Sequence, residues 1–402
     1  MPEFRTIDQL NAEDKTVLLR VDFNVPFKDG VITDTTRLTR VIPTLKALLE
    51  KSCKLVLISH LGRPKGKIQP DLSLKPVAKE LSNILKKEIL FSKESTGNVA
   101  QDHINKMSNG DILMLENIRF HPQEEQNDPS FSQQLSELGD IYVNDAFSTA
   151  HRAHASTEGI SHFLPAYAGK LMTAEIHALQ TALEAPEKPV IAIVGGAKIS
   201  TKLELLNNLI KKVDYLVLGG AMANTFINAM GLNVGTSLCE KSLLSTAQEI
   251  IENAKIQQCQ IMLPTDVVVA KEFKEHSPHK TLTLDQISSD DMILDIGENT
   301  VKNIVHVACQ CKTVLWNGPM GAFETLPFDQ GTSSLAQAIA ELTQDNTLKA
   351  IAGGGDTVAA LAHADVLDQF SYVSTAGGAF LEWLEGKELP GIKALQAASK
   401  AA

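Results

Sequence analysis

Side chains that can bind anions recur in the first half of this chain at the ends of short apolar runs. Three arginines and three histidines follow such runs, namely Arg63, Arg119, Arg152, His60, His151 and His154, and a fourth arginine, Arg37, follows Asp-Thr-Thr at a predicted helix start. A guanidinium group matches the oxygens of a phosphate or a carboxylate with two parallel hydrogen bonds. Each of these residues alone is more often a solvated surface charge. Their repetition after successive runs predicts a site for a small ligand with several negative charges.

In the second half of the chain, the residues that follow the apolar runs are glycine, lysine and acidic residues. The stretches are GGAKISTK at 195–202, GGAMANTF at 219–226, WNGPMGAFE at 316–324 and GGGDT at 353–357. Glycines let backbone N–H groups approach a phosphate closely, and a following helix start favours negative charge. Lys198 and Lys202 can hold phosphate charge. Asp356 suits Mg²⁺, which prefers one or two carboxylates together with phosphate oxygens; a helix N-cap is its alternative role.

Parallel α/β sheets would bring these stretches together. Short apolar runs alternate with helical patterns such as TRLTRVIPTLKALLEK and TKLELLNNLIKK, which is typical of buried strands joined by amphipathic helices. The runs end at Val21, Ile58, Leu115, Val143, Val194, Leu218, Leu263, Trp316, Ala352 and Val373. Ligands of open parallel sheets bind beyond the carboxyl ends of the strands. We therefore expect each half to be a doubly wound, Rossmann-like domain with its site at one sheet edge.

Composition narrows the class of protein. A chain of 402 residues favours two domains, since a single core rarely grows past roughly 250–300 residues. The net charge of −11 argues against nucleic acid or an acidic membrane as a partner. Five scattered cysteines fit no disulfide framework or zinc pattern. The start MPEFRTIDQL lacks the apolar core of a signal peptide, so we expect a cytoplasmic protein.

Motifs of other nucleotide enzymes are missing from the sequence. It has no G-x-x-x-x-G-K-[ST] loop, no H-R-D catalytic loop, and no G-x-G-x-x-G after a strand. The chain is therefore expected to be neither a P-loop enzyme nor a protein kinase, and a dinucleotide site is disfavoured.

Ten motifs resemble, in order along the chain, those of the phosphoglycerate kinase family. They are RVDFNVP at 20–26, SHLGRP at 59–64, ENIRFH at 116–121, NDAFSTAHRAHAS at 144–156, GGAKISTK at 195–202, GGAMANTF at 219–226, LPTDVV at 263–268, WNGPMGAFE at 316–324, GGGDT at 353–357 and LEGKELPG at 384–391. The resemblance implies a glycolytic enzyme that transfers a phosphoryl group reversibly from 1,3-bisphosphoglycerate to ADP, giving 3-phosphoglycerate and ATP. It also implies Mg²⁺ as a cofactor, direct in-line transfer with hinge-bending domain closure, and a monomer.

The resemblance also implies the domain organisation. We expect a substrate domain over 1–170, to which 389–402 returns, and a nucleotide-binding domain over 187–388. An interdomain helix is expected over 171–186, where the pattern KLMTAEIHALQTALEA lies between prolines.

Site residues are carried over where this sequence matches the family. The substrate set is Asp22, Phe23, Asn24, Arg37, His60, Leu61, Gly62, Arg63, Arg119 and Arg152. The nucleotide set is Gly196, Ala197, Lys202, Gly220, Asn317, Glu324, Gly353, Gly354, Gly355, Asp356 and Thr357. By this resemblance Glu324 would contact the ribose, Asp356 would hold the metal, and Arg37 and Lys198 would stabilise the phosphoryl group in transfer. No side chain need act as a general base, because the attacking oxygen is already ionised.

Four positions depart from the family pattern, namely Ser148, Thr236, Glu298 and Ala376. Ser148 and Ala376 stand where glycine is usual, so strain is expected there only if the backbone φ is positive. Two other functions remain as alternatives. A non-catalytic two-domain binding protein would share the arginines but would need no Mg²⁺, and a dehydrogenase would bind a nicotinamide.

Overall fold

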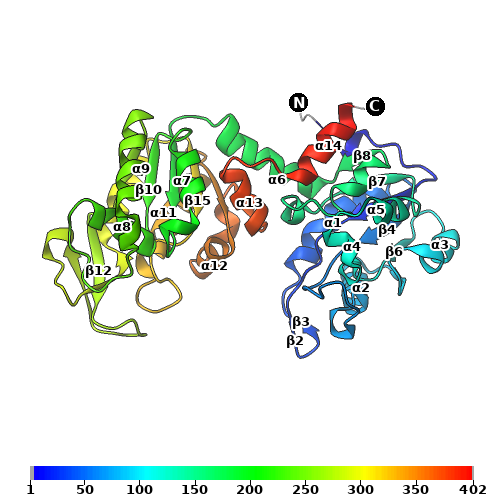
Figure 1. Cartoon of the computed structure of the whole chain (residues 1–402), viewed down its shortest axis with the longest axis horizontal. Coiled ribbons are helices and arrows are strands. Elements are labelled where there is room, and N and C mark those ends of the chain that lie inside the picture. Colours follow the sequence, from blue (N-terminus) through cyan, green and yellow to red (C-terminus); the bar gives the residue numbers. More distant parts are fainter. Residues whose placement is uncertain (1–3, 401–402) are drawn as a thin grey trace. The chain divides into compact units, whose positions relative to one another are not determined.

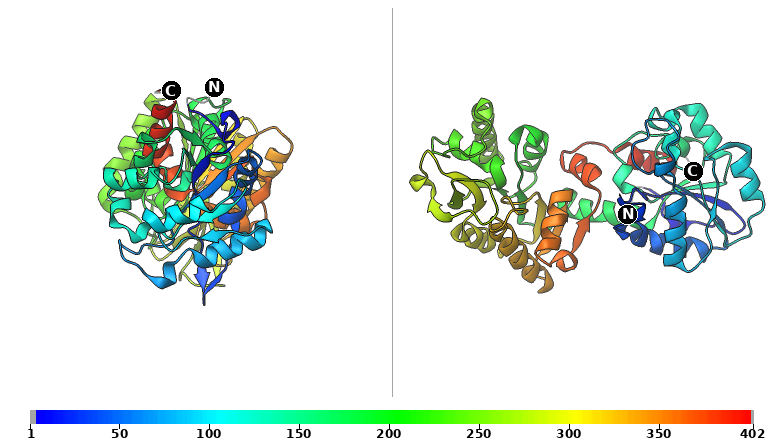
Figure 2. Two further views of the ribbon diagram at one scale, coloured as in Figure 1. Left: turned by 90° about the vertical axis from the view of Figure 1, so that its right-hand side faces the viewer. Right: turned by 90° about the horizontal axis from the view of Figure 1, so that it is seen from below.

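The computed structural model of the protein describes residues 4–400. They divide into two compact units: unit 1 comprises the chain up to residue 176 together with the segment from residue 388, and unit 2 comprises residues 177–387. Each unit contains a six-stranded, all-parallel sheet flanked by helices (Figure 1, Figure 2). The predicted fold class, with two parallel α/β sheets, is confirmed.

Unit 1 has the strand order β5-β6-β4-β1-β7-β8. Its strands are β1 (Thr16–Arg20), β4 (Lys54–Ile58), β5 (Leu90–Phe91), β6 (Ile112–Met114), β7 (Ile141–Asn144) and β8 (Ala166–Ala168). Its main helices are α1 (Thr36–Leu49), α2 (Lys75–Leu85), α3 (Gly97–Asn105), α5 (Pro129–Ser136) and α14 (Pro390–Lys400). The central strands are buried almost completely, because helices cover the sheet.

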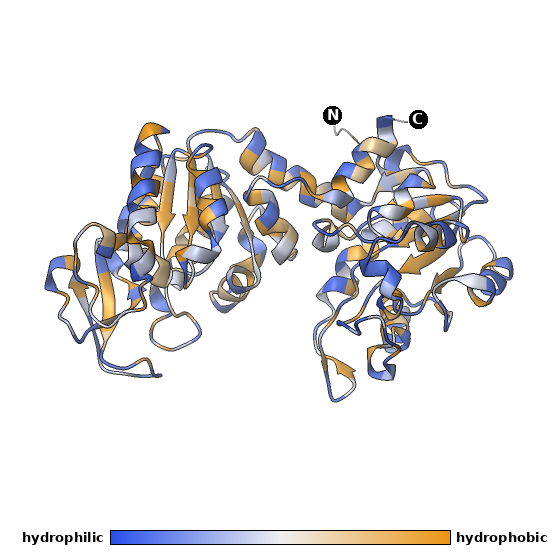
Figure 3. Ribbon diagram, viewed as in Figure 1, coloured by the Kyte–Doolittle hydropathy of each residue, from blue (hydrophilic) through white to orange (hydrophobic). Residues whose placement is uncertain are grey.

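Unit 2 has the strand order β11-β10-β9-β15-β16-β17. Its strands are β9 (Val190–Val194), β10 (Tyr215–Leu218), β11 (Gln260–Met262), β15 (Thr313–Asn317), β16 (Lys349–Gly353) and β17 (Tyr372–Ser374). Its helices include α7 (Leu203–Leu209), α8 (Gly220–Ala229), α9 (Leu244–Ile256), α10 (Glu298–Ala308), α11 (Gln330–Gln344), α12 (Gly355–His363) and α13 (Gly377–Leu384). Figure 3 shows largely hydrophobic strands between helices of mixed character. All ten apolar runs singled out in the sequence are strands of the two sheets.

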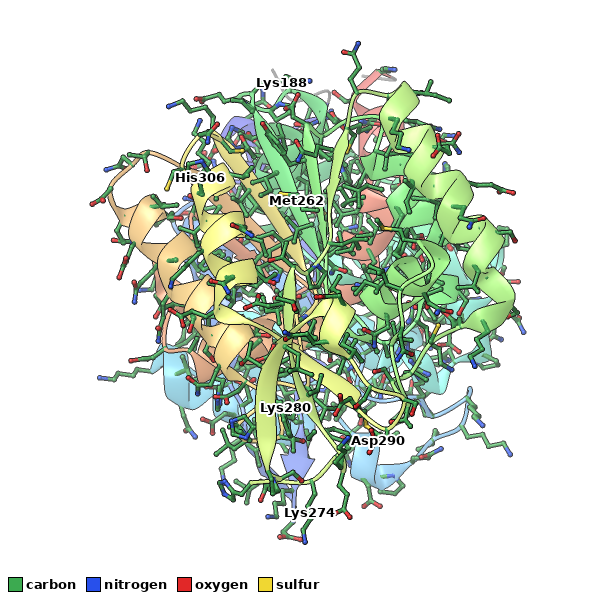
Figure 4. The ribbon with its side chains drawn as sticks, turned by 90° about the vertical axis from the view of Figure 1, so that its left-hand side faces the viewer. Lys188, Met262, Lys274, Lys280, Asp290 and His306 are labelled. Carbon is green, nitrogen blue, oxygen red and sulfur yellow. The ribbon has the colours of Figure 1, made fainter. Side chains whose placement is uncertain are left out.

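Two antiparallel elements were not predicted. The hairpin β2 (Phe27–Lys28) and β3 (Val31–Ile32) follows the first strand, and β12 (Asp266–Ala270), β13 (His279–Thr283) and β14 (Met292–Ile296) form a three-stranded sheet in unit 2. Most of β13 is exposed, so it lacks the apolar run that marks a buried strand. Figure 4 shows Lys280 on this sheet and Asp290 in the loop before β14. Lys271 Nζ lies 2.6 Å from Asp290 Oδ1 and 2.9 Å from Asp291 Oδ1.

The segment expected to connect the domains is helical. It comprises α6 (Lys170–Leu179) and a π-helical continuation, Gln180–Glu184.

The last helix, α14, packs within unit 1: Gly391 N donates to Ala150 O at 2.9 Å, and Arg5 Nη2 donates to Ala398 O at 3.1 Å. Within residues 4–400, every helix is too short or too polar to cross a membrane.

Replacing Ile193 with Ala should lower the free energy of unfolding of unit 2 by about 2–5 kcal/mol, because it opens a cavity in a packed core. Ile193 is fully buried in β9, in register with Trp316. Both tryptophans of the chain, Trp316 and Trp383, lie in unit 2, so urea unfolding followed by tryptophan fluorescence reports on it. Ile256→Ala is the control: Ile256 is 73% exposed, and its loss should change stability by less than about 0.5 kcal/mol. Equal losses in both variants would contradict the assigned core.

Candidate active site

The first group of predicted residues lies at the carboxyl edge of the unit 1 sheet. The strands β6, β4, β1 and β7 are neighbours and run parallel, so the loops that follow them meet at one edge. Asp22 follows β1, His60 follows β4, Arg119 follows β6 and Arg152 follows β7. Arg37 is the second residue of α1. The predicted convergence of cationic groups on one edge is therefore present.

The carboxylate of Asp22 is the centre of this group. Its Oδ2 accepts hydrogen bonds from Arg37 Nη1 and Ser148 Oγ, and its Oδ1 accepts one from Asn24 N at 3.0 Å. His60 Nε2 lies 3.9 Å from Oδ1. Although burial opposes ionisation, Arg37 and the hydrogen bonds from Ser148 and Asn24 hold the pKa of Asp22 well below its ordinary value. Asp22 is therefore an acceptor that organises Arg37.

Neutral imidazoles and buried guanidinium groups complete the site. Burial lowers the pKa of His60 well below its ordinary value, and it lowers the pKa of His151 to about 4 and of His154 to about 3. Arg119 Nη1 donates to Gly62 O at 2.9 Å, while its buried Nη2 has no hydrogen-bond partner within residues 4–400. Burial lowers the pKa of Arg119 to about 10, so it is still charged at neutral pH. A buried cationic N–H without a partner is costly, and an anionic ligand would satisfy it.

Some predicted substrate residues serve the site through the backbone or through packing. The side chains of Phe23 and Leu61 are buried in the hydrophobic core of unit 1, so they cannot contact a ligand in this conformation. Asn24 Oδ1 accepts a hydrogen bond from Gly62 N at 2.8 Å and thereby joins the first two loops. Arg63 is exposed. Phe23 and Leu61 belong to the motif because they anchor its loops in the core.

A buried layer behind the site was missed from the sequence. Arg20 is fully buried at the end of β1; its Nε donates to Ser156 Oγ at 2.8 Å, and its Nη2 lies 3.2 Å from His60 Nδ1. Ser156 Oγ in turn donates to Glu124 Oε1 at 2.6 Å. Arg20 is the charged residue of an apolar run and opens the RVDFNVP motif, but only the fold shows that it supports His60.

The second group of predicted residues surrounds a cavity of about 420 Å³ in unit 2. Among its lining residues are five predicted ones, namely Gly196, Ala197, Gly220, Glu324 and Asp356. Much of the remaining wall is apolar and includes Leu238, Leu294 and Phe323, which the sequence did not single out because such residues cannot be told from core residues. An apolar wall with a few polar groups at one side is typical of a small-molecule site.

Glycines let the loops around this cavity approach one another at backbone distance. A Cβ on Gly195 would lie 1.8 Å from Pro319 O. Gly220 has φ +64°, and its N–H donates to Met320 O at 2.8 Å. Side chains at these positions would separate the loops. The repeated Gly-Gly pairs of the sequence thus have a steric reason.

Polar contacts tie Lys202 to the loops after β15 and β16. Lys202 Nζ donates to Asn317 Oδ1 at 2.6 Å, and Asn317 Nδ2 donates to Gly353 O at 2.8 Å. Thr357 Oγ1 accepts from Gly318 N at 2.7 Å. Burial lowers the pKa of Lys202 to about 8, while Asp356 opposes that shift. A phosphate bound at these loops could therefore replace Asn317 as the acceptor of the Lys202 ammonium.

Asp356 and Lys198 are both exposed, and Asp356 lines the cavity whereas Lys198 does not. The N-cap of α12 is Gly354, with φ +102°, and Asp356 lies in the first turn, so the alternative that Asp356 is the N-cap is wrong. No group of three or more His, Cys, Asp or Glu residues that could hold a metal occurs within residues 4–400. Asp356 instead offers a single carboxylate at a cavity that suits a phosphorylated ligand. That donor set fits Mg²⁺ shared with phosphate oxygens.

The four departures from the family pattern are accommodated without backbone strain. Ala376 has φ −95° and is buried, and Ser148 lies in the 3-10 turn Phe147–Thr149 without a positive φ. Glu298 opens α10 and lies 2.6 Å from Lys302 Nζ, and Thr236 Oγ1 donates to Asp291 O at 3.2 Å. A glycine is therefore not required at either position where the family usually has one.

Comparisons with known proteins point to a single family. The profile of the family "Phosphoglycerate kinase" matches residues 7–387. A phosphoglycerate kinase of Rhodopseudomonas palustris is 56% identical over 393 residues, 98% of each chain, and one of Methylorubrum populi is 54% identical, covering 99% of this chain and 100% of the relative. The structure of phosphoglycerate kinase from Coxiella burnetii matches with a TM-score of 0.91 at 44% identity, over 98% of this chain and 99% of that one. The enzyme from Pyrococcus horikoshii matches with a TM-score of 0.83 at 30% identity, over 99% and 100%.

Affinity for ADP should fall as the pH rises through about 8, because burial lowers the pKa of Lys202 to about 8 and only the charged ammonium attracts phosphate. Lys202→Arg keeps its charge at every accessible pH and should remove this dependence. Titration calorimetry with ADP and Mg²⁺ from pH 7 to above pH 9 would measure both proteins. The same pH dependence in Lys202→Arg would assign the titration to another group.

Proposed function

The chain belongs to the phosphoglycerate kinase family, and from this premise we propose how its two sites divide the reaction. The protein is a phosphotransferase with a carboxyl group as acceptor: it transfers a phosphoryl group reversibly from 1,3-bisphosphoglycerate to ADP, giving 3-phosphoglycerate and ATP in glycolysis. We assign the three-carbon acid to unit 1 and the nucleotide to unit 2. The observation that carries the assignment of the acid to unit 1 is the buried Nη2 of Arg119, which has no hydrogen-bond partner within residues 4–400, at the sheet edge where Asp22 also holds Arg37.

We propose that 3-phosphoglycerate binds at the cationic edge of unit 1. This ligand carries a phosphate and a carboxylate, and Arg37, Arg119 and Arg152 offer guanidinium groups to both. Arg119 is already desolvated, so its attraction to an anion is screened less than that of a surface arginine. Asn24 and neutral His60 supply hydrogen-bonding groups that orient a hydroxylated acid without cancelling positive charge. Asp22, whose negative charge is paired with Arg37, adds a further acceptor.

We propose that ADP or ATP binds in the unit 2 cavity. The apolar wall suits the base, and Glu324, which lines the cavity, would accept hydrogen bonds from the ribose. Lys202 and the backbone of Gly353–Asp356 would hold the phosphates at the start of α12, where the helix dipole favours anions. Asp356 would hold Mg²⁺, which when bound neutralises phosphate charge.

The reaction requires little covalent chemistry from the side chains of the protein. The attacking oxygen of a carboxylate or a nucleotide phosphate is already ionised, so the residues act by orienting ligands and neutralising charge. We assign Arg37 and Lys198 to the phosphoryl group in transfer. In-line transfer with hinge-bending closure, which belongs to this family's reaction, would exclude water from the reacting groups. A monomeric state and a cytoplasmic location are proposed from family membership alone.

A coupled assay tests the function directly. Purified protein supplied with 1,3-bisphosphoglycerate, ADP and Mg²⁺ should form ATP. Asp356→Ala should reduce turnover by orders of magnitude, because the metal loses its protein ligand, yet it should leave the affinity for 3-phosphoglycerate measured by calorimetry unchanged. Absence of ATP formation in the wild type would favour the binding-protein alternative, and a fully active Asp356→Ala protein would refute its role with the metal.

Arg37→Ala should lower kcat by about 10³–10⁵-fold, the range seen for cations that contact a phosphoryl group in transfer. KM for 3-phosphoglycerate should change far less, since the interaction is strongest in the transition state. Lys46→Ala removes one positive charge from an exposed position of the same helix and should leave kcat unchanged. A loss of affinity alone in Arg37→Ala would show that Arg37 holds the ground state.

A further inference from the structure

Ser148 places a hydroxyl group inside the charge pair at the centre of the unit 1 site. Its Oγ donates to Asp22 Oδ2, the same oxygen that accepts from Arg37 Nη1. Asp22 has a side chain only 12% exposed, whereas that of Arg37 is 34% exposed. One oxygen of the buried Asp22 carboxylate therefore accepts from two donors. One of these donors, Arg37, has a long side chain that is partly exposed.

The two donors differ in how firmly the fold holds them. Ser148 lies in a 3-10 turn whose backbone hydrogen bonds include Thr149 N to Ala146 O at 3.0 Å and Ala150 N to Phe147 O at 2.9 Å. The turn is fixed further by Gly391 N of α14, which donates to Ala150 O. The hydroxyl of this short side chain can leave Asp22 only by rotation about its single χ1 bond or by movement of the turn. The Arg37 guanidinium, by contrast, can swing on a long side chain.

Arg37 Nη1 is the atom that donates to Asp22 Oδ2. A guanidinium turned fully toward a phosphoryl group, with both of its terminal nitrogens as donors, would give up this contact. A largely buried carboxylate oxygen that loses its donor carries a desolvation penalty. With Ser148 in place, the same oxygen keeps a hydrogen bond after Arg37 has left, so the penalty is smaller.

We propose that Ser148 is a positioning residue for the phosphoryl transfer: its hydroxyl keeps Asp22 Oδ2 hydrogen-bonded while Arg37 moves from Asp22 to the transferring phosphoryl group. This proposal rests on the proposed function, in particular on the role of Arg37. Ser148 acts through Asp22 and does not touch the substrate. It therefore changes the rate at which bound substrate reacts and leaves the affinity for substrate nearly unchanged.

Kinetics of hydroxyl-deletion variants test this. Ser148→Ala should lower kcat by about 10- to 100-fold, the effect expected for losing a hydrogen bond to a charged group, with KM for 3-phosphoglycerate changed by less than about twofold. Ser148→Gly removes the same hydroxyl and should lower kcat to the same extent as Ser148→Ala. It allows the proposal to be tested if the alanine variant folds poorly. Ser148→Thr keeps a hydroxyl and should restore most of the rate. Ser161→Ala is the control, because Ser161 donates only to Glu158 O within unit 1.

A double-mutant cycle separates action through Asp22 from a general effect on the turn. In an Asp22→Asn background, Ser148→Ala should cause little further loss of kcat, because the charged acceptor on which it acts is gone. Additive losses would overturn the proposal and assign Ser148 to folding of the turn. A rise in KM with unchanged kcat would also overturn it, by indicating direct substrate contact. A wild-type protein without turnover would instead refute the proposed function, and the positioning role with it.

Discussion

The edge of a parallel sheet is the constraint on which both sites depend. Parallel strands that are neighbours end at the same side, so loops far apart in the sequence converge there without long connections. In unit 1 this brings Asp22, His60, Arg119 and Arg152 together although they span more than a hundred residues of chain. In unit 2 the same geometry joins Lys202 to the loops after β15 and β16. Similar architecture thus serves two unlike chemistries.

The two units differ in how they prepare to receive negative charge. Unit 1 desolvates cationic side chains and keeps its imidazoles neutral, with Arg20 and Glu124 buried beneath as a supporting layer. In unit 2 the absence of Cβ atoms at Gly195 and Gly220 lets the loops around the cavity approach one another at backbone distance. Guanidinium forks are directional, which agrees with our assignment of a small acid to the first arrangement. The second suits a nucleotide, whose phosphates need donors and whose base needs an apolar wall.

Buried polar groups also explain how the first site stays organised without ligand. Asp22 offers its oxygens to three donors, so Arg37 is held near the site and the loop after β7 is tied to the loop after β1. Ionic contacts of this kind hold geometry more than they add stability, because desolvation offsets much of the attraction. The charge pair orients Arg37 at the site that we assign to the three-carbon acid. The desolvation cost of the Asp22–Arg37 pair is offset by the apolar core into which Phe23 and Leu61 are packed.

The sequence by itself determined the fold class, the ten principal strands, the division into cationic and glycine-rich loops, and the family. Short apolar runs, helix-period patterns and local motifs are properties of residues close together in the chain, so they can be read directly. Tertiary structure alone decided that Arg20 supports His60, that Phe23 and Leu61 face the core, and that Leu294 and Phe323 line a cavity. It also decided that Ser148 meets Asp22. These contacts join residues distant in the chain, and whether a leucine lines a pocket or fills a core depends on what lies opposite it in space.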